Sequence, residues 1–479
     1  MVSPAVGYTL IMRLETRSTP GAFVTLASAI ADAGGIIGAV DMRSVGRAVL
    51  TRDVSVTVGS DAVASAVRAA IGRLDGVRLI SVSDSTFLAH LGGKLRIDPK
   101  IPVKTRIDLS KVYAPGVQRV AMAIAADPRK VFQLTIKRNT VAVVSDGSAV
   151  LGLGDIGPLA AAPVMEGKCM LFKQFGEIDA FPILLDTSDV DAIVETVTHI
   201  APIFGAINLE DIAAPGCFEI ESRLQERLDI PVMHDDQHGK ACAILAGLIN
   251  AAAVVGKRIE DLTVVVAGSG AAGTATMKML LTAGVRDVIP VDRAGALNRT
   301  DRYEDSHWNW LAENTNRQNR RGTLSEVLKG ADVFIGASAP GILRPQDIAN
   351  MARDPIVFAM ANPTPEITPE AAAPYAAVMA TSRPFFPNQL TSLLAFPGIF
   401  RGALDCRAGR ITDGMKLAAA KAIASIITDA ERGPEYIVPS VFDTRVVGAV
   451  ARAVAAAAVE DGVARRHLVS EGEDLTAPV

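Results

Sequence analysis

The sequence predicts an α/β protein with three regions. These are a ferredoxin-like βαββαβ module over residues 1–90, a mixed α/β domain over 91–235, and a doubly wound Rossmann domain with C-terminal helices over 236–479. The first region shows strand and helix patterns in the order βαββαβ. After residue 237, helical and β-rich segments alternate, and a glycine-rich turn follows a valine-rich run.

Composition excludes several classes of function. With 49% hydrophobic and 21% charged residues, a chain of 479 residues has ample material for a core. A formal charge of −4 and a pI near 6.0 argue against a nucleic-acid partner. The mean hydropathy of +0.29 comes largely from Ala and Val, and the apolar runs are too short to predict a membrane span or a signal peptide. Four scattered cysteines without a CxxC pair predict reduced thiols in a cytoplasmic protein.

The first region alternates compactly. Period-two patterns predict strands, and helical patterns fill the intervals. The predicted strands are Tyr8–Glu15, Ile36–Arg43, Val49–Val58 and Val77–Ala89, and the predicted helices are Gly21–Ala33, ended by Gly34 and Gly35, and Asp61–Leu74, capped by Asp61. The module resembles an ACT domain, which implies an amino-acid effector bound at a paired interface. A packing or dimerisation module without a ligand is the alternative.

The rest of the chain reads as two further α/β regions. A polar link with two prolines precedes residue 111, and strands are predicted at Thr140–Val144 and Ala180–Leu185. Beyond residue 237, strands are predicted at Leu262–Ala267, Asp287–Val291, Val333–Gly336, Ile356–Met360 and Ala377–Ala380. Alanine-rich helices are predicted at Asp413–Ala430 and Arg445–Val459, before a tail from Ser470 that is expected to fray.

A dinucleotide site is predicted where a valine-rich strand meets the helix Thr274–Ala283. Glycines there let the backbone turn tightly and approach a pyrophosphate, which the helix N-terminus then binds. The predicted cofactor-binding residues are Gly268, Ser269, Gly270, Ala271, Ala272 and Gly273. Asp292 follows the second strand at the position that binds a ribose diol, which favours NAD. Arg293 could meet a 2′-phosphate and keeps NADP as the alternative.

Two acidic pairs predict a site for a hard cation. Glu210 and Asp211 form one pair, and Asp235 and Asp236 form the other, directly before a long apolar helix. Oxygen ligands of this kind suit Mg²⁺ or Mn²⁺ better than Zn²⁺. Acidic pairs are more often solvated surface, and only the apolar flanks and the neighbouring Rossmann unit favour a site here. Lys168 sits in an apolar context, where a nearby cation and partial desolvation would suit it to general-base work.

Several motifs occur in an order that resembles the malic enzymes, specifically the short bacterial form behind an ACT-like domain. The resemblance covers roughly residues 90–460. Its motifs lie at Val144–Gly154, Pro163–Lys168, Ile207–Asp211, His234–Gly239, Gly336–Gly341, Ala361–Glu366 and Phe396–Arg401.

The resemblance implies a role for each matching residue. Tyr113 corresponds to the general acid, Lys168 to the general base, and Asp235 to the residue that orients this lysine. The implied metal ligands are Glu210, Asp211 and Asp236, and the implied cofactor and substrate contacts are Ser338, Asn362 and Ser392. The implied reaction is oxidative decarboxylation of malate to pyruvate and CO₂ with NAD(P). The partners expected are a small-molecule substrate and a further copy or copies of the chain, with no nucleic acid or membrane.

Departures from the family pattern cluster around the substrate. Ala114 replaces a Thr after Tyr113, Lys240 replaces a Thr after the His-Asp-Asp-Gln-His-Gly motif, and Thr391 and Ser392 replace an Asn pair. Ser392 has no amide donor for a substrate carboxylate, so the wall is altered while the metal and acid–base residues remain. Two alternatives follow: the same chemistry on another β-carboxy 2-hydroxy acid, or a catalytically weak sensor that binds an amino acid or nucleotide.

Overall fold

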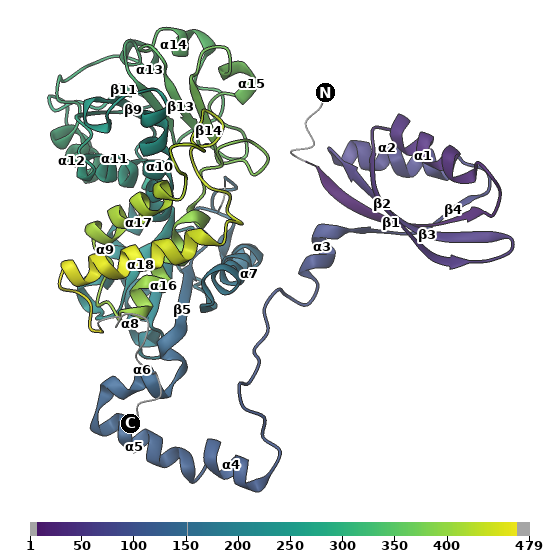
Figure 1. Cartoon of the computed structure of the whole chain (residues 1–479), viewed down its shortest axis with the longest axis horizontal. Coiled ribbons are helices and arrows are strands. Elements are labelled where there is room, and N and C mark those ends of the chain that lie inside the picture. The colour runs from purple at the N-terminus through teal and green to yellow at the C-terminus, as the bar shows by residue number, and fades with distance from the viewer. Residues whose placement is uncertain (1–6, 151, 467–479) are drawn as a thin grey trace. The chain divides into compact units, whose positions relative to one another are not determined.

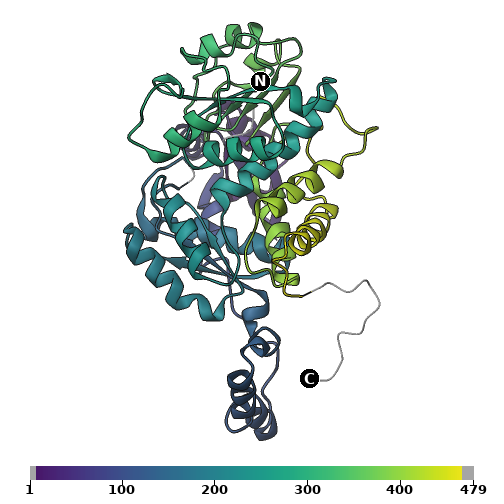
Figure 2. The same ribbon diagram turned by 90° about the vertical axis from the view of Figure 1, so that its left-hand side faces the viewer.

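The computed structural model describes residues 7–150 and 152–466, so the predicted tail from Ser470 lies outside the described residues. The chain divides into two compact units, Met1–Ile97 and Asp98–Val479, which we describe separately. Figure 1 labels the elements of both units, and Figure 2 shows the ribbon turned by 90°. Among the described residues, no helix combines the length and the apolar character that a membrane span requires.

The first unit is a four-stranded antiparallel sheet in the order β2-β3-β1-β4, with two helices packed on one face. The predicted βαββαβ order is confirmed: β1 (Tyr8–Arg17), α1 (Ala22–Asp32), β2 (Ile36–Val45), β3 (Val49–Val58), α2 (Asp61–Gly72) and β4 (Val77–Asp84). The core lies between the sheet and the helices and includes Leu10, Met12, Leu26, Val56 and Val67. Gly35 leaves no room for a side chain, because a Cβ there would lie 2.8 Å from Val56 Cγ1 and 2.9 Å from Ile30 Cγ2.

Two local predictions in this unit are wrong. The last strand ends at Asp84 rather than Ala89, because the Asp84 side chain accepts a hydrogen bond from the Thr86 N–H and starts helix α3 (Ser85–His90). The cap of α2 is Ser60, whose hydroxyl accepts from the Val63 N–H at 3.3 Å, and Asp61 is the first helical residue.

The second unit begins with five short helical segments, in which the structure describes a single buried residue, Lys137. These are α4 (Arg106–Val112) and α5 (Gly116–Ala126), followed by η1 (Pro128–Lys130), α6 (Val131–Leu134) and η2 (Ile136–Asn139). We call residues 101–126 the arm. A capping box between Thr105 and Asp108 starts α4, yet neither α4 nor α5 contains a buried residue. Apolar side chains along the arm are exposed, among them Ile101, Ile107, Leu109, Val117 and Met122.

The parallel sheet of the catalytic region has the order β6-β5-β7-β8. Its strands are β5 (Thr140–Ser145), β6 (Asp179–Leu184), β7 (Ala206–Leu209) and β8 (Val232–His234), and its helices are α7 (Gly157–Gly176), α8 (Val190–Ile200), η3 (Ala201–Ile203) and α9 (Gly216–Arg227). Helices α8 and α9 pack together over a core that includes Ile193, Val197, Ile207, Leu224 and Val232. The predicted strands at 140 and 180 are confirmed, and β7 and β8 were not singled out by their short patterns.

The Rossmann sheet has the order β11-β10-β9-β12-β13-β14 and is parallel except at β11. Its strands are β9 (Thr263–Ala267), β10 (Asp287–Asp292), β11 (Gly295–Ala296), β12 (Val333–Gly336), β13 (Ile356–Ala359) and β14 (Val378–Thr381), which confirms the predicted series. Strands β10 and β12 flank β9, so the direction of winding reverses beside β9. Open α/β sheets bind their ligands beyond the carboxyl ends of the strands at such a point.

Helices complete the second unit. The long α10 (Asp235–Val254) joins the two sheets and packs against α11 (Ala271–Thr282) and α17 (Asp413–Ser425). Helix α16 (Phe396–Asp405) packs against α7 and α18 (Arg445–Glu460). The remaining elements are η4 (Ile259–Asp261), α12 (Ser306–Asn314), α13 (Leu324–Val327), α14 (Pro345–Ala349), α15 (Pro369–Ala372) and η5 (Ser392–Leu394). Helix α17 ends five residues before the predicted Ala430.

Candidate active site

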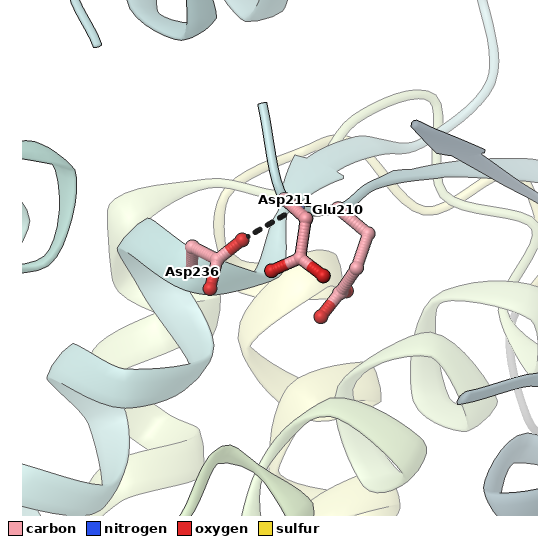
Figure 3. Close-up of side chains that lie close together, drawn as sticks. All are labelled: Glu210, Asp211 and Asp236. Carbon is pink, nitrogen blue, oxygen red and sulfur yellow. Dashed lines mark hydrogen bonds between the residues drawn. The ribbon is translucent and has the colours of Figure 1, made fainter. Parts of the chain in front are cut away.

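Both acidic pairs lie at the carboxyl edge of the catalytic sheet. Glu210 and Asp211 follow β7, and Asp235 and Asp236 open α10 directly after β8. Since β7 and β8 are adjacent parallel strands, with Leu209 opposite His234, the residues that follow them meet at one edge. Carboxylate oxygens of Glu210, Asp211 and Asp236 lie within 4.8 Å of one another (Figure 3). In this all-oxygen donor set Glu210 and Asp211 are buried and Asp236 is partly buried, and the set fits a hard divalent cation such as Mg²⁺ or Mn²⁺.

Lys168 projects from α7 into the same cluster. Its Nζ lies 2.6 Å from Asp235 Oδ2 and 2.9 Å from Glu210 Oε1, and its side chain is only 10% exposed. The ammonium also lies 4.2 Å from the centroid of the Phe396 ring. We call Lys168, Glu210, Asp211, Asp235 and Asp236 the Lys168 cluster. The structure therefore brings together the predicted base, its orienting carboxylate and the three predicted metal ligands.

Burial and neighbouring charges act against each other in the cluster. Burial alone disfavours the ammonium of Lys168, but the adjacent carboxylates of Asp235 and Glu210 outweigh it and raise the pKa of this lysine. Burial raises the pKa of Glu210 to about 8, even though Lys168 opposes the shift. Burial acts on Asp236 as well, yet Lys240 and His234 hold the pKa of this carboxyl well below its usual range.

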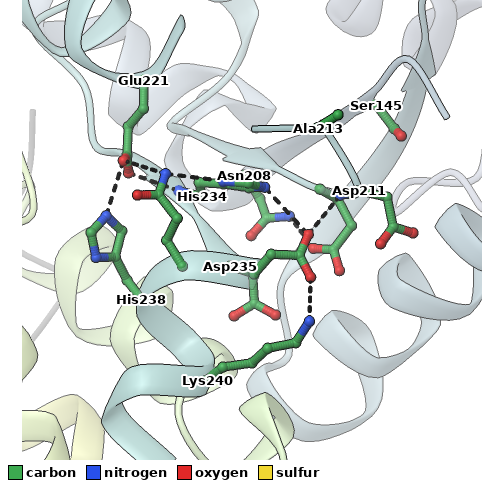
Figure 4. Close-up of polar contacts among 12 residues, drawn as sticks. Ser145, Asn208, Asp211, Ala213, Glu221, His234, Asp235, His238 and Lys240 are labelled. Atoms are coloured by element: carbon green, nitrogen blue, oxygen red, sulfur yellow. Dashed lines mark hydrogen bonds and ion pairs between the residues drawn. The ribbon is translucent and has the colours of Figure 1, made fainter. Parts of the chain in front are cut away.

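Glycine and a buried glutamate fix the turn that carries Asp235 and Asp236. A Cβ at Gly239 would lie 1.8 Å from Asp235 Oδ1, so this position has no room for a side chain. Glu221 of α9 accepts hydrogen bonds from the His234 N–H at 2.9 Å and from Gln237 Nε2 at 3.0 Å, and it lies 3.0 Å from His238 Nε2 (Figure 4). Its role was missed in the sequence, because Glu221 lies on a charged helix and nothing local marks it as buried.

A cavity of about 340 Å³ lies behind this turn, between α9, α10, α11 and α17. His238 and Lys416 line it, and Lys416 Nζ lies 3.3 Å from His238 Nδ1 and 2.7 Å from Asp413 Oδ1. Burial opposes the charged form of Glu221, but the neighbouring His238 lowers the pKa of this carboxyl to about 2. The cavity therefore shares its polar wall with the turn that presents the acidic pair.

The predicted dinucleotide turn has the geometry that a pyrophosphate requires. Gly268 adopts a φ of 109°, and a Cβ there would lie 2.4 Å from the Ala337 oxygen. A Cβ at Gly273 would lie 1.9 Å from the Gly268 oxygen, so helix α11 can approach the turn only without a side chain. Helix α11 begins at Ala271, three residues earlier than predicted, which places its free N–H groups at the turn.

The other predicted cofactor residues lie at the ends of neighbouring strands. Asp292 ends β10, and its Oδ1 accepts a hydrogen bond from the exposed Arg293 N–H at 2.7 Å. Ser338 follows β12, and its N–H donates to Glu366 Oε1 at 3.1 Å. Asn362 follows β13, and its Oδ1 accepts from the Ser382 hydroxyl at 2.7 Å.

Ser392 lies beside the start of α10. It begins η5, and a Cβ at Gly239 would lie 2.9 Å from Ser392 Cβ. The neighbouring Thr391 uses its hydroxyl to accept from the Leu393 N–H at 3.3 Å. Lys240, one residue after Gly239, donates to Asp236 Oδ1 at 2.6 Å. Two of the residues that depart from the family pattern, Lys240 and Ser392, thus flank the Lys168 cluster.

Tyr113 is not brought to this cluster. Its side chain is 69% exposed at the end of α4, and the hydrogen bonds described for it are backbone ones, to Leu109 and from Val117 within the arm. Lys168 is nearly buried, so a group that donates a proton at the same site must also be shielded from solvent. Tyr113 is not shielded within one chain, and the arm of that chain therefore does not provide the acid.

Comparison with known proteins places the chain. Residues 92–225 match the family model of the malic enzyme N-terminal domain, and residues 237–459 match that of the malic enzyme NAD binding domain. The chain is 57% identical over 463 residues to an NAD-dependent malic enzyme of Geobacillus stearothermophilus, covering 97% of each. It is 53% identical over 376 residues to a bifunctional malic/malolactic enzyme of Bacillus subtilis, covering 78% of this chain and 92% of the relative.

Solved structures agree. A malic enzyme of Pyrococcus horikoshii matches with a TM-score of 0.76 and 49% identity, over 78% of this chain and 89% of that one. An NAD-dependent malic enzyme of Thermotoga maritima matches with a TM-score of 0.75 and 48% identity, over 78% and 99%. The resemblance, the α/β fold with its Rossmann-type NAD-binding domain, and the enzyme class predicted from the sequence are confirmed, and the chain belongs to the malic enzyme family.

Proposed function

We propose that this protein catalyses the oxidative decarboxylation of malate to pyruvate and CO₂, with NAD as oxidant and Mg²⁺ or Mn²⁺ as cofactor. The observation that carries the proposal is the Lys168 cluster, in which a buried lysine touches two carboxylates beside a three-carboxylate cation site. The relatives named as NAD-dependent malic enzymes support the choice of reaction and of cofactor. The intact cluster argues against a sensor without catalysis.

The residues of the Lys168 cluster have different proposed roles. Glu210, Asp211 and Asp236 would hold the metal, which when bound supplies Lewis-acid stabilisation of the oxygen on C2. Asp235 and Glu210 favour the ammonium form of Lys168, and a cation held by the neighbouring carboxylates would offset their charge and favour the neutral amine. In that neutral form, Lys168 would accept the proton of the C2 hydroxyl as hydride leaves for the nicotinamide. Asp235 fixes the direction of the Lys168 amine through its contact of 2.6 Å. Asn362 and Ser338, at the ends of β13 and β12, would contact the nicotinamide half of the cofactor.

Turnover tests this proposal directly. The protein with Mn²⁺, malate and NAD should increase absorbance at the reduced-nicotinamide band and release CO₂ in equal amount. Substituted malates should be assayed in parallel, since Ser392 has lost the amide donor that the family pattern provides. A parent protein that oxidises a substituted malate but not malate would replace the proposed substrate and keep the chemistry.

We also propose that the arm packs against a second copy of the chain, which makes a homodimer the smallest complete enzyme. The support is the row of exposed apolar side chains on α4 and α5, together with the exposure of Tyr113 at their junction. A second copy covering the arm would deliver Tyr113 to a Lys168 cluster as the acid that protonates C3. Ile107→Glu should yield monomers by sedimentation that bind Mn²⁺ but do not turn over, whereas an active monomer would contradict the dimer.

For the first unit, we propose a regulatory role as an ACT-like module that binds an amino acid. Its support is the sheet order β2-β3-β1-β4 with both helices on one face, and the alternative is a packing module. Calorimetric titration of the full chain with individual amino acids tests this role, and a lack of any binding would favour the packing module.

The four cysteines are free and buried, which supports a reducing, cytoplasmic location.

A further inference from the structure

Both carboxylate oxygens of Asp236 are engaged, but by different kinds of partner. Oδ2 accepts the Asp211 N–H at 2.8 Å and lies 3.3 Å from His234 Nε2. These two partners belong to the strand ends that form the site, so they fix the carboxylate. Oδ1 instead accepts from Lys240 Nζ at 2.6 Å. A cation that binds Asp236 through the oxygen not held by the strand ends must therefore bind where the Lys240 ammonium now lies.

The charges favour an exchange. The four carboxylates of the Lys168 cluster lie beside two ammonium groups, that of Lys168 within the cluster and that of Lys240 at its edge. A divalent cation beside Asp236 would be repelled by an ammonium on the same oxygen, and this repulsion is strong in a partly buried site. The ammonium bonded to Oδ1 itself, that of Lys240, therefore has to move away when a metal binds through this oxygen.

Lys240 is the one that can move. Its side chain is 38% exposed on the first turns of α10, and it forms an i,i+4 pair with Asp236 alone among the described ion pairs. Lys168 is only 10% exposed, touches two carboxylates and packs on the Phe396 ring. A flexible side chain at the rim can swing into solvent at little cost, whereas Lys168 is enclosed.

We propose that Lys240 is an exchangeable internal cation of the metal site. It neutralises Asp236 while no metal is bound, and Mg²⁺ or Mn²⁺ displaces its ammonium from Oδ1 on binding. The inference rests on the proposed metal site but not on turnover. Two consequences follow: Lys240 lowers the affinity for the metal, and it stabilises the metal-free protein.

Lys240→Met tests both consequences, because Met has a similar length and helix preference without the charge. Free Mn²⁺ measured by EPR, with no malate or NAD present, should show a Kd about tenfold lower than that of the parent, since a competing cation has been removed. The midpoint of thermal unfolding in EDTA should fall, and saturating Mn²⁺ should close most of the gap. Lys240→Arg keeps a cation at this position and should keep a Kd within about twofold of the parent.

A matched control separates this effect from a general change of charge. Lys257 pairs with Asp332 at 2.8 Å in the Rossmann domain, and its side chain is 22% exposed. Lys257→Met removes the same charge from another Lys–Asp pair, so it should leave the Mn²⁺ affinity of the parent unchanged. An equal gain of affinity in Lys257→Met and Lys240→Met would overturn the proposal, as would no gain in Lys240→Met.

The parent protein provides a test that needs no variant. If metal displaces the ammonium, Mn²⁺ should increase the rate at which Lys240 is acetylated by a small amine-reactive reagent. Mass spectrometry of the labelled protein measures this rate. Unchanged or slower labelling of Lys240 with Mn²⁺ would contradict the exchange, even if the variants failed to fold. A protein that shows the exchange but no turnover would count against the proposed reaction only, whereas a parent that binds no Mn²⁺ would overturn both.

Discussion

The Lys168 cluster and the arm carry the two groups expected to move protons, but they differ in how the chain treats them. Lys168 is nearly enclosed and held at 2.6 Å from Asp235, while Tyr113 is 69% exposed on helices that contain no buried residue. Packing within one chain therefore completes the base and the metal ligands but leaves the acid outside. In the proposed dimer, the base therefore belongs to the fold of one chain, whereas the acid depends on assembly.

The largest expected effect is on catalysis by the buried Lys168. Lys168→Ala removes the only amine in contact with Asp235 and Glu210 in the described structure, so malate oxidation should fall by roughly 10²–10⁴-fold, the usual contribution of general acid–base catalysis. Reduced-nicotinamide absorbance measures the rate, and fluorescence titration should show unchanged NAD affinity. Lys173→Ala on the same helix is the control, since Lys173 is exposed and pairs with Asp179 instead. Parental turnover by Lys168→Ala would remove Lys168 from the role of base.

The proposed role of the exposed Tyr113 in a second copy is tested by mixing two inactive variants. Tyr113→Phe and Lys168→Ala should each be nearly inactive alone. If a second copy supplies Tyr113, a mixed dimer has one site with both groups, so an equal mixture refolded or co-expressed should recover about a quarter of the parental rate. Recovery would be zero if each chain used its own tyrosine. A recovered rate would show that Tyr113 acts on the Lys168 cluster of another chain. The absence of recovery would contradict this assignment.

The same contrast explains what could be predicted from the sequence. Motifs that combine local chain geometry with chemistry predicted which residues lie close together. Gly268 and Gly273 belong to a turn only a few residues long, and Asp236 lies two residues after the end of its strand. Glu221 was missed because its burial depends on packing between α9 and α10, segments that the sequence does not place together. The position of Tyr113 could not be predicted either, since its motif identifies a role and not the surface that covers it.

Metal binding should respond next in size. Asp236→Asn removes one of the three anionic ligands that lie within 4.8 Å of one another, and we expect the Mn²⁺ affinity to fall by about tenfold or more. EPR titration of free Mn²⁺ measures this loss, and turnover should fall in parallel at limiting Mn²⁺. Asp413→Asn is a useful control, because Asp413 lies on α17 beside Lys416, at the cavity behind the turn. An unchanged titration for Asp236→Asn would exclude this carboxylate from the site.

A smaller effect is expected at the altered substrate wall. Restoring Asn at both Thr391 and Ser392 should raise activity on malate, because an amide beside Gly239 returns donors to a substrate carboxylate. A charge-assisted hydrogen bond contributes roughly 1.5–3 kcal/mol, but we expect only about tenfold, since Lys240 also differs nearby and neighbouring changes rarely add. The kcat/KM for malate is the measurement. Loss of activity on a bulkier hydroxy acid without a gain on malate would favour the altered-substrate alternative.

The smallest effect is expected at the edge of the cofactor site. Asp292 ends β10 in the position predicted to bind a ribose diol. Arg293 is exposed, and the contact that the structure describes between the two is the hydrogen bond from the Arg293 N–H to Asp292 Oδ1 at 2.7 Å. Arg293→Ala should therefore change the NAD affinity by less than about twofold, as expected for a surface substitution. The weaker NADP affinity should fall further, because a guanidinium near the 2′-phosphate is lost. Fluorescence titration with both nucleotides separates the two. If the parent binds NADP better than NAD and Arg293→Ala abolishes that preference, the diol contact of Asp292 does not decide the cofactor, and Arg293 belongs to the site rather than to its rim.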